Sequence, residues 1–188
     1  MLDLVKRNVE KLYKEDELNL QDLKERLGLE KRPKIVEAFD ISHIQGADSV
    51  GSMVRFRDGK PDKSNYRRFK IKTIEGIDDP AMIAEVVRRR YSRLIEEEKE
   101  LPDLIVIDGG RMQLSAAFKE LHGLNLRIPV IGLAKKREEI YYPGLAEPQQ
   151  LDHKTRAIRL LQNIRDEAHR FAVKYHKVLR SKRTLGKR

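Results

Sequence analysis

Residues 104–110 read L-I-V-I-D-G-G, and this stretch says more about the fold than any other part of the chain. Four consecutive apolar residues are typical of a strand that is buried on both faces of a sheet. Asp108 follows that strand, where a carboxylate is costly to bury unless it is paired, hydrogen-bonded or bound to a metal. Because Asp-Gly is also a common turn dipeptide, Asp108 taken alone is better explained as a turn residue.

A second carboxylate changes that interpretation. Residues 35–43 read I-V-E-A-F-D-I-S-H, which predicts a strand over 35–41 with Asp40 near its end. If the two strands are neighbours, Asp40 and Asp108 lie together, and two carboxylates repel unless a divalent cation neutralises them. Oxygen ligands favour Mg²⁺ or Mn²⁺, and such an ion activates water for attack on a phosphate backbone. The pair therefore predicts a hydrolytic metal site.

A histidine on the last expected helix, residues 155–179, is the third candidate. It lies in the sequence R-D-E-A-H-R at 165–170, where His169 shares a helical face with Arg165. An imidazole there could bind the metal, orient a water or protonate the leaving oxygen. The simpler alternative is a surface histidine. His43, three residues after Asp40, is a weaker candidate with a supporting or structural use.

The remaining pattern predicts an α/β fold. The expected elements are one or two helices before Gly28, strands at 35–41, 48–56 and 66–73 with a turn at 57–61, a helix at 79–98, a strand at 104–107, a helix at 112–121, a strand at 128–133, a small hairpin at 139–142 and 149–151, and a helix at 155–179. Three antiparallel strands followed by parallel βα units give a mixed sheet with flanking helices. This order resembles the ribonuclease H-like architecture. We expect a helical arm over 1–32, a nuclease domain over 33–183 and a basic tail over 184–188.

Composition narrows the class of protein. The 188 residues carry a formal net charge of +10, of which +9 falls in residues 152–188, with 12 basic against 3 acidic side chains. Positive charge gathered in one segment is typical of a polyanion-binding protein, although a solvated helix face would look similar. The absence of Cys excludes disulfides, Cys-ligated zinc and thiol catalysis. With no signal peptide and no membrane-length apolar stretch, we expect a cytoplasmic protein without a membrane partner.

Several cations are candidates for contacting the phosphates of DNA. These are Arg67, Arg68, Lys70, Lys135, Lys136, Arg165 and Arg170. A single cation of this kind is more often a solvated or core residue than a phosphate contact. The pair Lys135-Lys136, which follows the strand at 128–133, is the strongest candidate.

The motifs together resemble one family. They are F-D-I-S-H-I-Q-G at 39–46, Y-R-R-F at 66–69, G-I-D-D at 76–79, L-P-D-L-I-V-I-D-G-G at 101–110, Q-L-S-A-A at 113–117, I-P-V-I-G-L-A-K at 128–135 and L-L-Q-N-I-R-D-E-A-H-R-F-A at 160–172. Over residues 18–183 the chain resembles the C-terminal nuclease half of the UvrC family, the bacterial nucleotide-excision-repair endonuclease.

The resemblance implies a ribonuclease H-like fold and an Asp-Asp-His site at Asp40, Asp108 and His169. It also implies a further acidic site residue at Asp79. From its own position, Asp79 is expected to be the N-cap of the helix that begins there, with Pro80 at the first helical position.

The resemblance further implies a 5′ incision near lesions in damaged double-stranded DNA, and the partner UvrB. We expect a monomeric fragment without the family's 3′-incision domain, its UvrB-binding module and its helix-hairpin-helix domain. The rival hypothesis is a catalytically silent nucleic-acid-binding module of the same fold.

Overall fold

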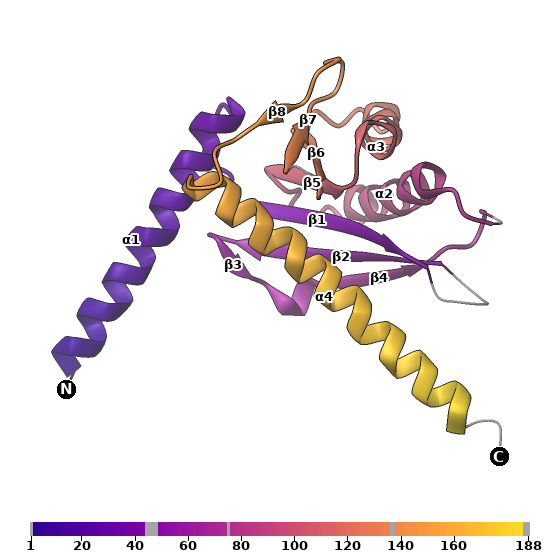
Figure 1. The fold of residues 1–188 in the computed structure, drawn as a ribbon, viewed down its shortest axis with the longest axis horizontal. Coiled ribbons are helices and arrows are strands. Elements are labelled where there is room, and N and C mark those ends of the chain that lie inside the picture. The colour runs from indigo at the N-terminus through magenta and orange to yellow at the C-terminus, as the bar shows by residue number, and fades with distance from the viewer. Residues whose placement is uncertain (1, 44–48, 75, 136–137, 186–188) are drawn as a thin grey trace.

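The computed structural model describes residues 2–43, 49–74, 76–135 and 138–185. It shows a mixed sheet with helices on both faces (Figure 1). In chain order the elements are α1 (Leu2–Leu27), β1 (Ile35–Ser42), β2 (Val50–Arg57), β3 (Lys60–Pro61), the 3₁₀ helix η1 (Lys63–Asn65), β4 (Arg67–Lys70), α2 (Asp79–Glu96), β5 (Leu104–Asp108), α3 (Arg111–Gly123), β6 (Val130–Ala134), β7 (Glu139–Tyr141), β8 (Gln149–Gln150) and α4 (Arg156–Leu185).

The strand order confirms the predicted topology. Within the described chain the order is β3-β2-β1-β5-β6-β7-β8, and β4 pairs with β2. The pairs β1–β5 and β5–β6 are parallel, whereas β1–β2 and β2–β4 are antiparallel. Asp58 and Gly59 both have positive φ, 50° and 78°, between β2 and β3. This is the backbone that a two-residue hairpin turn requires, so the turn predicted at 57–61 is confirmed.

Two hydrophobic cores lie on the two faces of the sheet. One core joins the sheet to α4 and to the end of α1, and the other joins it to α2 and α3 (Figure 1). Successive side chains of a strand point to opposite faces, so Ala38 of β1 belongs to the first core and Phe39 to the second. Asp40 therefore faces α4, on the same side as Ala38.

The N-terminal segment forms one helix. α1 ends at Leu27 and is followed by Gly28 with φ 63°, so the predicted glycine stop is confirmed. Leu20, Leu23 and Leu27 are buried in the core beneath α4. The first turns of α1 extend well beyond the sheet (Figure 1). The division of the chain at residues 32 and 183 stays a prediction.

The third predicted strand, 66–73, is too long. β4 covers only Arg67–Lys70, because the backbone N–H groups of Lys72 and Thr73 donate to the buried carboxylate of Glu85 and not to a strand. The chain thus leaves the sheet at β4 to meet α2.

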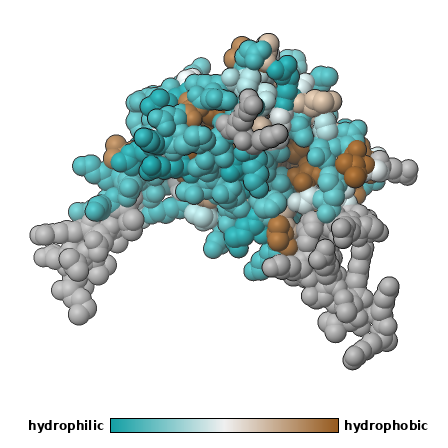
Figure 2. Space-filling model, viewed as in Figure 1, coloured by the Kyte–Doolittle hydropathy of each residue, from teal (hydrophilic) through white to brown (hydrophobic). Residues whose placement is uncertain are grey.

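The face of the molecule that carries α4 is mostly hydrophilic, with hydrophobic side chains scattered singly (Figure 2). Among the helices that the structure describes, none combines the length and the apolar character that crossing a membrane requires.

Candidate active site

The sheet places the two predicted carboxylates side by side. In the parallel pair β1–β5, Phe39 lies opposite Ile107, so Asp40 and Asp108 are the next residues toward the carboxyl ends of both strands. Asp40 is only 6% exposed, although it carries a carboxylate. The hydroxyl of Ser42 donates to its Oδ2 at 2.6 Å. The adjacent strands that the sequence predicted therefore bring both residues to one edge.

The two carboxylates perturb each other. Burial, followed by the neighbouring carboxylate of Asp40, raises the pKa of Asp108 to about 7. The positive charges of Arg165 and Lys135 act in the opposite direction without cancelling this shift. A pair of buried like charges that ordinary pH does not fully ionise is typical of sites that bind a cation or exchange a proton.

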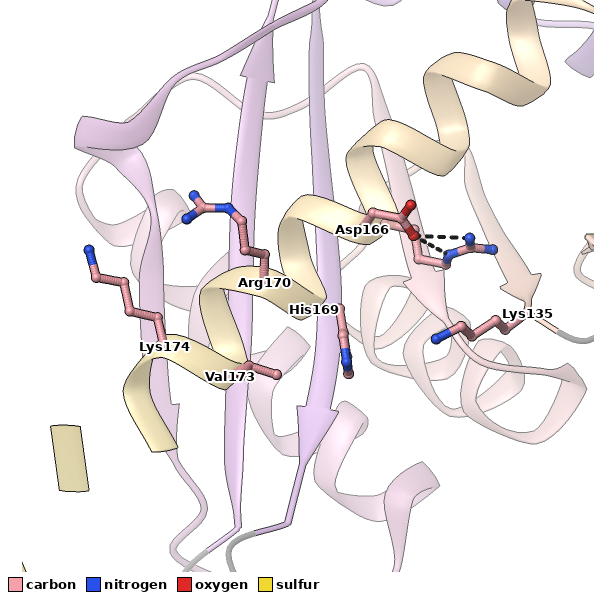
Figure 3. A pocket seen from close by; sticks show the side chains of 7 residues that line it. Lys135, Asp166, His169, Arg170, Val173 and Lys174 are labelled. Atoms are coloured by element: carbon pink, nitrogen blue, oxygen red, sulfur yellow. Dashed lines mark hydrogen bonds and ion pairs between the residues drawn. The ribbon is translucent and has the colours of Figure 1, made fainter. Parts of the chain in front are cut away.

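Helix α4 crosses this edge and carries His169. The imidazole Nδ1 lies 4.0 Å from Asp40 Oδ1, and the side chain is 55% exposed. It lines an open hollow of about 640 Å³. Figure 3 shows Lys135 directed toward His169 from the β6 side, and Arg170 and Lys174 on the other side of α4. The residues that line the hollow are Lys135, Arg165, Asp166, His169, Arg170, Val173 and Lys174.

The predicted phosphate contacts fall into distinct groups. Arg165 is 6% exposed and is held by Glu138 at 2.6 Å and by Asp166 at 3.0 Å, so it fixes α4 as well as facing Asp108. Arg170 is paired with Glu167 at 2.6 Å. Lys135 is more exposed and follows β6 directly.

The other predicted cations lie on the edge strand β4 or cannot be placed. Arg68 stacks on the Phe171 ring of α4, with its guanidinium carbon 4.0 Å from the ring centroid. Lys70 belongs to the same face, because it is two residues further along the strand. Arg67 points to the opposite face of the sheet, since it lies opposite Met53 of the α2-side core. Lys136 lies outside the described residues.

Asp79 is not the N-cap of α2, contrary to the sequence-based expectation. The cap is Asp78, whose carboxylate accepts from the backbone N–H of Ala81 at 3.0 Å, and Asp79 is the first helical residue. Two successive aspartates before a proline offer the same signature, and only the backbone geometry distinguishes them. Asp79 instead pairs with His43, whose Nε2 lies 2.7 Å from Oδ1.

His43 thus connects the end of β1 to the start of α2. Its second ring nitrogen, Nδ1, lies 2.9 Å from the hydroxyl of Ser49. Both imidazole nitrogens are therefore engaged, which matches the supporting use that its position after Asp40 suggested.

The donor set fits a hard divalent cation in part. Among the side chains that the structure describes, no three His, Cys, Asp or Glu residues lie close enough together to hold a metal ion. The two carboxylates do fit Mg²⁺ or Mn²⁺, because these ions are commonly held by one or two carboxylates, with water and substrate phosphate completing the shell. Whether His169 joins them as a ligand stays a prediction.

Some residues at the site were not singled out from the sequence. Ser42 follows Asp40 by two residues, and the period of a strand puts both on one face, so this signal was available. Glu138 has no such signal, because it lies 27 residues from Arg165, with β7, β8 and the start of α4 between them.

Carboxylates on the first strand and on its parallel neighbour, beneath a last helix, define the ribonuclease H-like class. A solved structure with this fold is endonuclease V of Ciona intestinalis in complex with a 23mer DNA containing an inosine followed by a ribo-adenosine. It aligns with a TM-score of 0.51 and 16% identity, over 93% of this chain and 98% of that chain. At this identity the likeness shows the fold alone.

The sequence places the chain within that class. The family described as the UvrC RNAse H endonuclease domain matches residues 24–173, and the chain belongs to this family. UvrABC system protein C of Methanosarcina acetivorans is 56% identical over 182 residues, which are 97% of this chain and 35% of that protein. The corresponding protein of Prosthecochloris aestuarii is 54% identical over 166 residues, 88% of this chain and 27% of that protein. The chain thus spans about a third or less of the length of these relatives.

Proposed function

We propose that the chain is a metal-dependent endodeoxyribonuclease domain that makes the 5′ incision near lesions in nucleotide excision repair. The observation that carries the proposal is the pair of carboxylates, Asp40 and Asp108, at adjacent strand ends beside a hollow lined by cations. The similarity to UvrABC system protein C supports the repair context.

Each residue of the site has a physical task in this reaction. A Mg²⁺ or Mn²⁺ ion held by Asp40 and Asp108 would neutralise charge on the phosphate and lower the pKa of a bound water. Lys135 attracts the phosphate into the hollow, because it is the more exposed cation beside Asp108. His169 either adds an imidazole ligand or moves a proton at the attacking or leaving oxygen.

The substrate in this proposal is damaged double-stranded DNA. A strand that enters the hollow meets Lys135 on one side of α4 and Arg170 on the other, and Arg68 and Lys70 continue the positive surface along β4. UvrB is the partner that would recruit the larger protein, and the chain itself is proposed to be monomeric.

The test is metal binding and strand cutting by the chain and its Asp108→Asn variant. With Mn²⁺ and a lesion-containing duplex, the wild-type chain should cut, and the variant should lose at least about 10³-fold in rate because a metal site supplies several kcal/mol. Asp152→Asn removes an exposed turn carboxylate away from the hollow and is the matched control. A wild-type rate in Asp108→Asn would overturn the proposal.

The same assay separates the rival hypothesis. A silent nucleic-acid-binding module would bind the duplex without binding Mn²⁺ at the carboxylates and without cutting. Binding without any Mn²⁺-dependent cutting, at protein concentrations above the dissociation constant, would favour that module.

A further inference from the structure

A second hollow lies on the face of the sheet opposite α4. It encloses about 290 Å³ between β2, β4 and α2. Its lining is dominated by arginine: Arg55, Asn65, Arg67, Phe69, Arg89, Arg90, Arg93, Leu94, Glu97, Lys99 and Glu100. We call it the arginine hollow. None of its residues belongs to the hollow at His169.

The floor of the arginine hollow is a rigid, neutralised network. Glu37, which is fully buried, accepts from Arg90 at 2.6 Å and from the hydroxyl of Tyr91 at 3.0 Å. Arg55 lies 3.8 Å from the same carboxylate and also pairs with Asp62 and Glu100. These contacts fix the side chains of the floor, and the charges of Arg55 and Arg90 are compensated by carboxylates.

The rim carries more positive charge than its carboxylates offset. Arg93 and Lys99 share the single carboxylate of Glu97, at 2.7 Å and 2.6 Å. Hydrogen bonds from Lys99 and then Arg93 lower the pKa of Glu97 to about 2. Arg67 donates to the carbonyl oxygens of Ser64 and Tyr66, which carry no charge.

The rest of the rim is closer to balance. Arg57 pairs with Glu100 at 2.6 Å, and Arg55 of the floor, which Glu37 and Asp62 already compensate, also reaches this carboxylate at 3.2 Å. Arg89 is held between the Glu85 carboxylate and the carbonyl of Lys70, with its guanidinium 5.7 Å from the Phe69 ring centroid. Cations that outnumber carboxylates around a concave, low-dielectric floor focus a positive potential into it.

The edge strand connects this hollow to the active-site face. Within the described residues β4 pairs only with β2, and its side chains alternate. Arg68 lies opposite Ser52 and contacts α4, whereas Arg67 and Phe69 enter the arginine hollow. In the sheet, Asp108, Asp40, Ser52 and Arg68 form one row across four strands. Neighbouring strands are about 4.8 Å apart, so the backbones of Arg68 and Asp40, two strands apart, are separated by about 10 Å.

We propose that the arginine hollow is a second phosphate-binding site, which holds the backbone of a nucleic acid strand that passes around β4 from the active-site face. Guanidinium groups suit this role, since their fork of N–H donors matches phosphate oxygens. This inference rests on the proposed function in one respect, which is that DNA is the polyanion that the hollow binds. The site itself would bind phosphate groups whether or not the chain cuts.

The first test is the salt dependence of DNA binding, measured by fluorescence anisotropy on a labelled duplex in EDTA so that no cutting occurs. Arg67→Ala and Arg93→Ala should each reduce the magnitude of the log–log slope by about one. Both side chains are exposed, so the buried Glu37 network stays intact. Arg88→Ala removes an exposed cation from the same helix outside the hollow, and should leave the slope unchanged.

The second test uses inorganic pyrophosphate, followed by shifts of backbone amide signals in NMR spectra. Shifts at Arg67, Phe69 and Arg93 would support an anion site, even if the chain bound no DNA and the proposed function failed. If Lys135→Ala changes the slope while Arg67→Ala and Arg93→Ala do not, and pyrophosphate shifts none of these signals, the arginine hollow is no phosphate site and the proposed function stands. An equal slope change in Arg88→Ala would also overturn the inference, because the effect would then be general surface charge.

Discussion

Strand β1 carries two buried carboxylates that have opposite surroundings. Glu37 points toward α2 and is met by Arg90, Arg55 and the hydroxyl of Tyr91. Asp40, three residues later, points toward α4 and meets the carboxyl of Asp108. The first carboxylate is neutralised by the protein, and the second is set against a like charge.

The difference separates a structural from a functional use of the same chemistry. A buried carboxylate with matched cations needs nothing from outside, and removing one partner leaves an uncompensated charge. A buried carboxylate beside another one gains from a cation or a proton that the protein does not supply. Burial alone therefore does not distinguish a structural carboxylate from a functional one. The sign of the neighbouring charge does.

After the two carboxylates themselves, the largest effect is expected at the histidine beside the like-charged pair. His169→Ala should lower the incision rate by about 10² to 10⁴, the usual range for acid–base groups. The fold should persist, because the side chain is 55% exposed. Steady-state cutting rates with Mn²⁺ measure this, and His122→Ala, an exposed histidine on α3, is the control.

A metal titration of the same variant assigns the role of His169. Weakened Mn²⁺ affinity indicates a ligand, and unchanged affinity with a lost pH dependence indicates acid–base work. Cutting at the wild-type rate would show that the three-residue site is wrong.

The next prediction compares the contributions of Glu37 and Asp40 to stability directly. Glu37→Gln leaves Arg90 and Arg55 buried without their shared counter-charge, and should reduce the free energy of unfolding by about 3 to 5 kcal/mol. Asp40→Asn removes one of two like charges, and should leave the unfolding free energy unchanged or raise it. Urea denaturation of both variants measures the contrast. A similar loss in the two variants would mean that Asp40 is held by the fold as firmly as Glu37.

A smaller effect concerns acid stability on the α2 face. Glu85 is 2% exposed; burial alone would raise its pKa, but hydrogen bonds from Thr73, Arg89 and the Lys72 backbone lower the pKa below its ordinary value. The stability that this carboxylate contributes is fully present above about pH 4.5 and is lost as the pH falls through the lowered pKa of the folded state.

The variant Glu85→Gln should therefore lose about 1.5 to 3 kcal/mol at pH 7, the usual range for hydrogen bonds to a charged group. Its stability should also depend less on pH between about 4.5 and the acid limit. Thermal unfolding across this range measures both changes. Equal pH slopes in the variant and the wild type would assign the acid sensitivity to other carboxylates.

The sequence predicted what depends on local pattern. The apolar run before Asp108 and the strand expected over residues 35–41 placed each carboxylate near a strand end, and the parallel pairing of the two strands brings both to one edge of the sheet. The glycine stop after α1 and the turn at 57–61 also follow from local backbone preferences.

What the sequence missed depends on contacts between distant residues. Arg165 was expected to contact DNA, and its ion pair with Glu138 follows from no spacing rule. β4 is short because Glu85, more than ten residues away, accepts the N–H groups of Lys72 and Thr73. The side of the sheet on which Arg67 lies depends on the register with Met53, which no pattern within β4 specifies.

The smallest effect concerns the start of α2, where the sequence predicted Asp79 as the N-cap but the structure has Asp78 in that position. Asp78→Ala should reduce the unfolding free energy by about 1 kcal/mol, the usual contribution of an N-cap, because the Ala81 N–H loses its acceptor. Asp79→Ala keeps the cap and loses the contact with His43, so its effect on stability should be smaller. Since Asp79 does not form a metal-holding group with Asp40 and Asp108 in the described structure, its loss should leave Mn²⁺ affinity unchanged. Urea denaturation and Mn²⁺ titration measure the two quantities. A fall in Mn²⁺ affinity in Asp79→Ala would place this carboxylate with the like-charged pair, as the family resemblance implies, and would extend the active site to the start of α2.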